Sequence, residues 1–211
     1  MRIAIPLFEG MTALDAVGPY EVLSRVPAWE LTFVADEPGP KRTDNDLLTL
    51  TADTALADMP DPDVMVVPGG AGTRTYDNDE LVEWIRSAHE RTRWTTSVCT
   101  GSLLLGKAGV LQGLRATSHW LWLEKLREYG AEPTGERVVE QGKVITAAGV
   151  SSGIDMALRL VQIELGDEAA QAIQLSIEYD PEPPVDAGSP AKAPQAIVDL
   201  VRQAGTALET P

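Results

Sequence analysis

The sequence predicts an α/β fold built on a mostly parallel β-sheet. Three observations lead to this expectation. Short apolar runs typical of buried strands recur along the 211 residues, helical stretches separate them, and hydrophobic residues make up 44% of the chain. Strands that alternate with helices form parallel sheets covered on both faces, and this hydrophobic content is enough for a sizeable core.

The first half of the chain contains three expected strands, at Ile3–Phe8, Glu30–Ala35 and Val64–Pro68, of which the third is short and buried. A helix is expected after the first strand and another after the third, at Asp15–Val26 and Asn78–Arg91. Between them, Asp46–Thr51 alternates weakly, which favours a small hairpin or an edge strand. The third strand ends in a run of small residues, Gly69-Gly70-Ala71-Gly72.

The middle of the chain continues the same rhythm. A strand at Trp94–Cys99 leads directly into a helix at Gly101–Ala108. A short strand is expected near Ala116, followed by an amphipathic helix at His119–Tyr129 that Gly130 closes. Two further strands, expected to pair with each other around a turn at Gln141-Gly142, are Arg137–Glu140 and Lys143–Ala147.

The last third of the chain is mostly helical. Ser152 and Asp155 have the spacing of a capping box at a helix start, and Gly166 breaks this region into two helices. Residues 179–194 are rich in proline and too irregular for a helix, so we expect a surface segment. A final helix is expected at Ala196–Leu208. We predict one domain over residues 1–211, because no repeat or inter-domain linker is present.

Composition excludes several classes of function. The net charge of −15 repels nucleic acid backbones, and no local cluster of Lys and Arg offsets it. The chain has no run of about 18 apolar residues and no leader before its first strand, so we expect neither a membrane span nor secretion. One cysteine cannot form an internal disulfide. A cytoplasmic protein is therefore expected.

That single cysteine, Cys99, is the most informative residue. It lies at the expected turn from strand to helix, where a side chain is exposed and points toward the positive end of a helix. Such a setting lowers the pKa of a thiol and favours the reactive thiolate. The alternative is a free cysteine that acts as a small buried hydrophobic residue. The strand-turn-helix context favours the reactive interpretation.

Three loops follow the expected parallel strands and should meet at one edge of the sheet, where ligands bind in such folds. They are Glu9–Asp15, Gly69–Gly72 and Cys99–Gly101. Asp15 either caps the first helix or faces the thiol as a carboxylate that exchanges a proton. Both roles are compatible, because a residue at a helix start projects toward the strand ends.

The tandem glycines Gly69 and Gly70 either form a simple turn or present backbone N–H groups to a ligand. A glycine N–H and the N–H of Thr100 would then stabilise a developing negative charge. The spacing matches neither a dinucleotide-binding loop nor a Walker loop. The glycines are therefore candidates for substrate binding.

His119 is either a structural residue or the partner of Cys99, and Trp120 beside it is a candidate for an apolar substrate pocket. Both are included as candidate substrate-binding residues. The other histidine, His89, lies beside Glu90 and Arg91 on a helix that is expected to be solvated. Two histidines and one cysteine disfavour a transition-metal site, and no metal is predicted.

At these residues the chain resembles the ThiJ/PfpI family of the class I glutamine amidotransferase-like superfamily. The resemblance covers roughly residues 1 to 195 and is carried by six segments, Asp15–Leu23, Pro68–Gly70, Cys99–Ser102, Ala116–Trp120, Ala148–Leu158 and Glu178–Pro190. It implies a flavodoxin-like three-layer α/β/α sandwich. It also implies a nucleophile elbow, the sharp strand-to-helix turn that carries the nucleophile, at Cys99, and commonly a homodimer.

Within this family the chain is most similar to the isonitrile hydratases, which add water to an isonitrile and need no metal or organic cofactor. The resemblance implies Cys99 as nucleophile, Asp15 as acid/base and Thr100 as a further residue near the substrate. The family's intracellular-protease branch carries histidine at the position of Thr100, so peptidase activity is disfavoured. The late loop at Ala148–Ser151 also lacks the histidine and glutamate of the amidotransferase triad.

Three other functions remain open at the level of sequence. A glyoxalase or deglycase-like enzyme would use a cysteine and an acidic residue in a similar arrangement. A thiol sensor of oxidative stress would need only an exposed, oxidisable cysteine. A ligand-binding regulatory domain is disfavoured, because no helix-turn-helix segment is recognisable and the charge opposes DNA binding.

Overall fold

The computed structural model describes residues 1–75 and 77–207. The chain forms two compact units, Met1–Ile177 and Glu178–Pro211. The first unit contains the sheet and every candidate site residue predicted from the sequence. The single domain over residues 1–211 stays a prediction.

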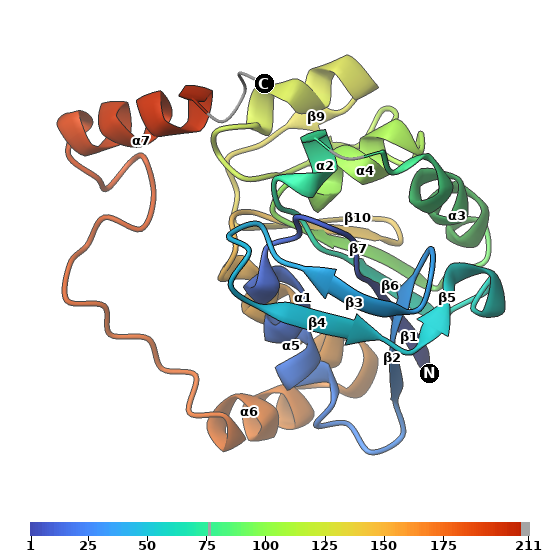
Figure 1. Cartoon of the computed structure of the whole chain (residues 1–211). Coiled ribbons are helices and arrows are strands. Elements are labelled where there is room, and N and C mark those ends of the chain that lie inside the picture. The colour runs from blue at the N-terminus through green and yellow to red at the C-terminus, as the bar shows by residue number, and fades with distance from the viewer. Residues whose placement is uncertain (76, 208–211) are drawn as a thin grey trace. The chain divides into compact units, whose positions relative to one another are not determined.

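A seven-stranded sheet forms the centre of the first unit, in the order β10-β11-β7-β6-β1-β2-β5 (Figure 1). Its strands are β1 (Arg2–Pro6), β2 (Glu30–Ala35), β5 (Thr54–Ala55), β6 (Val64–Val67), β7 (Trp94–Val98), β10 (Val138–Gln141) and β11 (Val144–Ala147). Each neighbouring pair is parallel except β10 and β11, which form an antiparallel hairpin. The mostly parallel sheet predicted from the sequence is confirmed.

Helices cover both faces of this sheet. In order they are α1 (Ala13–Leu23), α2 (Gly72–Thr75), α3 (Asp79–His89), α4 (Gly101–Lys107), α5 (Ser152–Leu165) and α6 (Asp167–Ser176). On one face, Val98 of β7 packs against Gly153 of α5. On the other, Thr95 of the same strand contacts His89 of α3 at 2.8 Å. Because side chains alternate along a strand, these contacts define a three-layer arrangement.

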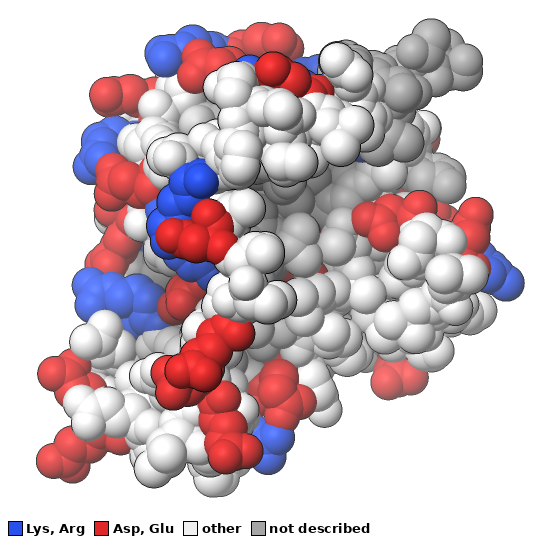
Figure 2. Space-filling view, turned by 90° about the vertical axis from the view of Figure 1, so that its left-hand side faces the viewer, with Lys and Arg blue, Asp and Glu red and all other residues white. Residues whose placement is uncertain are grey.

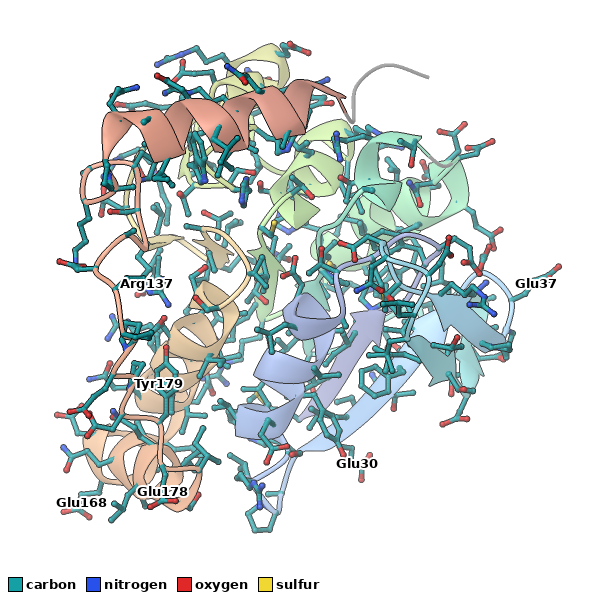
Figure 3. The ribbon with its side chains drawn as sticks, turned by 60° about the vertical axis from the view of Figure 1, so that its left-hand side comes forward. Glu30, Glu37, Arg137, Glu168, Glu178 and Tyr179 are labelled. Carbon is teal, nitrogen blue, oxygen red and sulfur yellow. The ribbon has the colours of Figure 1, made fainter. Side chains whose placement is uncertain are left out.

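The central strands are buried on both faces, as expected for a parallel sheet between helical layers. All four residues of β6 are buried, and so are all four of β11. The parallel strands β1, β6 and β7 all end at the same edge. In Figure 3, Glu30 and Glu37 mark the amino end of β2 and the turn beyond its carboxyl end. The loops after β1, β6 and β7 therefore meet as the sequence predicted.

A two-stranded hairpin, β3 (Gly39–Arg42) with β4 (Thr49–Ala52), lies outside the main sheet. The sequence predicted a weak element only at Asp46–Thr51, because glycine and proline begin β3. A second small pair, β8 (Arg115–Ala116) with β9 (Glu132–Pro133), contains the short strand expected near Ala116. The 3₁₀ helix η1 (Leu56–Asp58) and the one-turn α2 were not predicted.

Two local predictions are wrong. The expected amphipathic helix at His119–Tyr129 is the shorter 3₁₀ helix η2 (Leu123–Tyr129), which Gly130 ends at φ +74° as predicted. The capping box is absent, since Ser151 is the N-cap of α5 and Oγ of Ser152 donates to the Gly149 carbonyl. Asp155 forms an ion pair with Arg137, which explains why its carboxyl does not cap the helix.

The second unit, taken by itself, is irregular up to α7 (Gln195–Ala207), in agreement with the proline-rich segment and the final helix predicted from the sequence. Leu208, the expected end of that helix, lies outside the described residues. On the face shown in Figure 2, acidic and basic side chains are interspersed, and the described residues form no broad basic patch there. None of the helices in the described parts of the chain has the length and apolar character needed to cross a membrane.

Candidate active site

Cys99 occupies a sharp turn between β7 and α4. Its φ of +57° lies in the left-handed region that non-glycine residues rarely adopt. A residue held there stores roughly 1–3 kcal/mol of strain, and such residues gather at functional sites. The predicted nucleophile elbow is thus present as a geometry. However, only 5% of Cys99 is exposed, so the sulfur is buried rather than open to solvent as the sequence analysis expected.

Hydrogen bonds from three segments hold this turn. The Cys99 N–H donates to the carbonyls of Ala147 and Ala148, at 3.1 and 2.9 Å, just after β11. The Cys99 carbonyl accepts from Oγ of Ser102 and Oγ of Ser118, each at 3.1 Å. Both polar backbone groups of the strained residue are therefore satisfied, which fixes the direction of its side chain.

Asp15 lies in the first turn of α1 and is fully buried. It does not cap the helix, because Thr12 is the N-cap residue. Its Oδ2 instead accepts the Gly69 N–H at 2.9 Å, whereas Oδ1 is buried without a hydrogen-bond partner. Burial raises the pKa of Asp15 to about 7, although the Gly69 N–H and the Cys99 side chain oppose that rise. Asp15 is therefore beside the thiol, as the functional interpretation predicted.

The glycine loop holds the site together but does not supply the free N–H groups that were expected. The Gly69 N–H binds Asp15, and the Gly70 N–H donates to Oγ1 of Thr100 at 2.9 Å. In this structure the Gly70 N–H is already engaged by Thr100, and substrate binding by Gly69 and Gly70 stays a prediction. A side chain at Gly69 would place Cβ 2.5 Å from the Thr100 nitrogen, so the close approach requires glycine.

The electrostatics of Cys99 also differ from the sequence prediction. Burial, and next the charge of Asp15, raise the pKa of the thiol to about 12. Hydrogen bonds from the backbone of Val150 and from Thr100 oppose this and favour the thiolate. The expected low pKa is wrong because a carboxylate and low-polarity surroundings outweigh the helix start. Because the pKa of Cys99 is higher than that of Asp15, the proton rests on the sulfur in the pH range where the Asp15 carboxyl titrates.

Val150 is a site residue that the sequence analysis missed. It follows β11, the neighbour of β7, and adopts φ +30°, which is unusual for a β-branched residue. The parallel register of β7 and β11 places the loop after β11 beside Cys99. The expected strand at Lys143–Ala147 could have pointed to this loop, whose backbone, rather than its side chains, faces the sulfur.

His119 and Trp120 lie on the loop before η2, with ring centroids 6.0 Å apart. Cδ2 of His119 packs against Gly149, and Nδ1 accepts the Leu121 N–H at 3.4 Å. Burial and the positive charge of Arg74 lower the pKa of His119. None of these contacts joins the imidazole to Cys99, so the structure does not form a Cys-His pair. Substrate binding by His119 and Trp120 stays a prediction.

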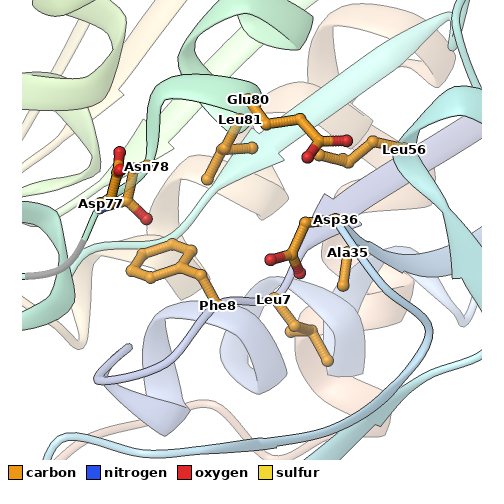
Figure 4. A pocket seen from close by; sticks show the side chains of 9 residues that line it. All are labelled: Leu7, Phe8, Ala35, Asp36, Leu56, Asp77, Asn78, Glu80 and Leu81. Atoms are coloured by element: carbon orange, nitrogen blue, oxygen red, sulfur yellow. The ribbon is translucent and has the colours of Figure 1, made fainter.

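A pocket of about 300 Å³, including open solvent, lies near the carboxyl ends of β1 and β2 (Figure 4). Its lining combines apolar, acidic and amide side chains: Leu7, Phe8, Ala35, Asp36, Leu56, Asp77, Asn78, Glu80 and Leu81. None of the candidate site residues contributes to it. The described residues contain no group of three or more histidine, cysteine and acidic side chains able to hold a metal ion.

The fold and the elbow define an α/β protein whose cysteine lies at the carboxyl edge of a parallel sheet, beside a buried carboxyl. A comparison with protein-family models identifies the family to which a protein of this class belongs. The model described as the DJ-1/PfpI family matches residues 1–163, and the chain belongs to this family. The resemblance found in the sequence is confirmed.

Individual relatives narrow the comparison. A curated protein from Pseudomonas putida named isonitrile hydratase is 44% identical over 204 residues, which cover 96% of this chain and 89% of the relative. A solved ThiJ/PfpI family protein from Pseudomonas syringae superposes with a TM-score of 0.91 at 33% identity, covering 98% of this chain and 86% of that one. The crystal structure of Drosophila melanogaster DJ-1beta has a TM-score of 0.75 at 21% identity, covers 84% and 97% of the two chains, and shows a shared fold.

Proposed function

We propose that this chain hydrates isonitriles to N-substituted formamides, with Cys99 as nucleophile and Asp15 as acid and base. The observation that carries the proposal is the pairing of a buried thiol with a buried carboxyl whose Oδ1 has no hydrogen-bond partner. A relative that shares 44% of its residues across nearly the whole chain is named isonitrile hydratase, which supports this substrate class.

The first step joins sulfur to the terminal isonitrile carbon. Ionised Asp15 takes the thiol proton through Oδ1, and the resulting carboxylic acid delivers it to the terminal carbon as the thiolate attacks. The S–H bond breaks, and C–S and C–H bonds form on the same carbon. The product is a thioimidate, with carbon doubly bonded to nitrogen, and Asp15 is again a carboxylate.

Water completes the reaction in the second step. Asp15 removes a proton from water as the hydroxide adds to the thioimidate carbon, and this proton passes to the nitrogen. The intermediate then collapses, since its C–S bond breaks while its hydroxyl becomes the formamide carbonyl. The hydroxyl proton returns to sulfur through Asp15. One water is consumed, Cys99 is regenerated, and no metal or organic cofactor takes part.

Backbone groups around the sulfur favour this chemistry. The Val150 and Thr100 backbones hydrogen bond to the thiol and stabilise the thiolate as the proton leaves. In a buried site these dipoles act strongly, because little solvent screens them. Thr100 is assigned a positioning role through its hydroxyl, which binds the glycine loop, rather than a direct role in bond formation.

The test is incubation of the purified protein with a simple alkyl isonitrile, with formamide measured by chromatography. We expect turnover by the unmodified protein, none by Cys99→Ala, and a loss of about 10²–10⁴-fold in Asp15→Asn. The exposed residue Asp58 provides a matched control, and Asp58→Asn should behave as the unmodified protein. Turnover of methylglyoxal but not of isonitrile would instead support the glyoxalase-like alternative.

A further inference from the structure

The loop that joins β3 to β4 lies against the start of α1. Met11 forms a parallel bridge with Thr43, and the Asp44 N–H donates to the Met11 carbonyl at 2.9 Å. The Gly10 N–H donates to the Arg42 carbonyl at 2.9 Å. The hairpin that Figure 1 labels β3 and β4 is therefore attached to the segment that leads from β1 to Asp15.

Asp44 binds the residue that places Asp15. Its Oδ2 accepts the hydroxyl of Thr12 at 2.5 Å. The Thr12 N–H donates to the Gly69 carbonyl at 2.8 Å, and the Thr12 carbonyl accepts the Asp15 N–H at 3.1 Å. Thr12 is thus bonded to Asp44, to the glycine loop and to the first turn of α1, so Asp44 contacts the framework that holds the reactive carboxyl.

From this arrangement we propose that Asp44 is a positioning residue for the reaction. Its carboxylate fixes Thr12, and with it the turn that carries Asp15, and its negative charge makes Asp15 a stronger base toward the Cys99 thiol. This inference rests on the proposed function, in which Asp15 removes the thiol proton. A stronger base removes that proton more readily, which raises the rate when Asp15 is ionised.

Acidic side chains on the elements next to α1 are engaged in contacts of their own. Asp155 of α5, the helix packed on α1, is paired with Arg137. Glu9, on the loop after β1, accepts the backbone N–H of Arg42. The charge that acts on Asp15 is that of Asp44. It raises the pKa of Asp15 in addition to burial, which has the larger effect.

The decisive variant is Asp44→Asn, because asparagine retains an oxygen that accepts the Thr12 hydroxyl but carries no charge. Asp46→Asn is the matched control, since Asp46 is exposed on the same loop and its φ of +60° suits asparagine. The measurements are the pH dependence of kcat/KM with an alkyl isonitrile and a ¹³C NMR titration of the Asp15 carboxyl, assigned by its absence in Asp15→Asn.

We expect Asp44→Asn to move the rise of kcat/KM and the Asp15 titration to lower pH, and to lower the high-pH plateau severalfold. Asp46→Asn should change none of these. Added salt should move the Asp15 titration in the same direction in the unmodified protein, and by less in Asp44→Asn, because salt screens the charge of Asp44 together with the net charge of −15. Asp44→Ser, which also removes the charge, is the second variant if Asp44→Asn fails to fold.

An Asp15 titration that is the same in Asp44→Asn as in the unmodified protein would overturn the inference. Equal displacement by the Asp46→Asn control would overturn it too, because the effect would then be general to the loop. The NMR titration does not depend on turnover. A protein that fails to hydrate isonitriles would therefore contradict the proposed function, while the titration still decides whether Asp44 controls Asp15.

Discussion

The backbone N–H of Gly69 donates to Oδ2 of Asp15 at 2.9 Å, while Oδ1 of the same carboxyl is buried without a hydrogen-bond partner. The two oxygens therefore have different tasks. One anchors the side chain to the loop after β6, and the other is the oxygen to which the proposed function assigns proton exchange with the Cys99 thiol. Leaving a buried carboxyl oxygen unpaired is unfavourable for folding, and under the proposed function this oxygen is the one that exchanges protons.

Asp15→Asn should become more stable relative to the unmodified protein as the pH rises. Because the pKa of Asp15 is raised from 3.8 to about 7 on folding, its contribution to stability is complete at low pH and is lost between those values. The variant cannot lose it. Relative to the unmodified protein, the free energy of unfolding of Asp15→Asn should gain about 3 kcal/mol between pH 5 and pH 8. Urea unfolding at both pH values measures this, and an unchanged difference would contradict a buried, ionised Asp15.

The rate of hydration should depend on the ionisation of Asp15. We expect kcat/KM for an alkyl isonitrile to rise with pH through a midpoint of about 7, because the active form has an ionised carboxyl and a protonated thiol. The pKa of the thiol, about 12, lies far above this range, so no fall is expected between pH 7 and 9. A steady rate below pH 5 that declines near pH 7 would show that protonated Asp15 is the active form instead.

Thr100 should act through the glycine loop. Thr100→Val removes the hydroxyl oxygen that accepts the Gly70 N–H and leaves a buried donor unpaired, which costs about 1–3 kcal/mol of stability. Because this loop also holds Asp15, kcat should fall as well. Thr100→Ser keeps the hydroxyl and should restore both properties. If the serine variant were as impaired as the valine variant, the hydroxyl would not explain the role of Thr100.

The alternation of strands and helices made the fold predictable from the sequence. Buried strands such as Val64–Val67 are short and continuously apolar, and the helices between them have clear ends. The prediction failed where tertiary contacts replace local preference. Residues His119–Trp122 form a turn instead of a helix, and Ser118 just before them binds the Cys99 carbonyl. A pattern of apolar residues carries no information about that distant contact.

The sequence predicted which residues of the candidate site lie together better than it predicted their pKa values. The parallel strand order explains why Asp15, Gly69 and Cys99 could be expected at one edge. The direction of the thiol pKa could not be predicted, because it depends on how deeply Cys99 is buried and on the charge of Asp15 beside it. Val150 was missed because its contribution is a backbone group. The homodimer and the cytoplasmic location remain predictions from sequence.

The most direct test of the central claim is the rate of formamide production from an alkyl isonitrile, compared between the unmodified protein and Cys99→Ala at pH 8. The account predicts multiple turnovers by the unmodified protein and only the uncatalysed rate with Cys99→Ala. Formamide production by Cys99→Ala at a rate comparable to that of the unmodified protein would contradict nucleophilic catalysis by Cys99. The absence of formamide with both proteins would contradict isonitrile hydration itself.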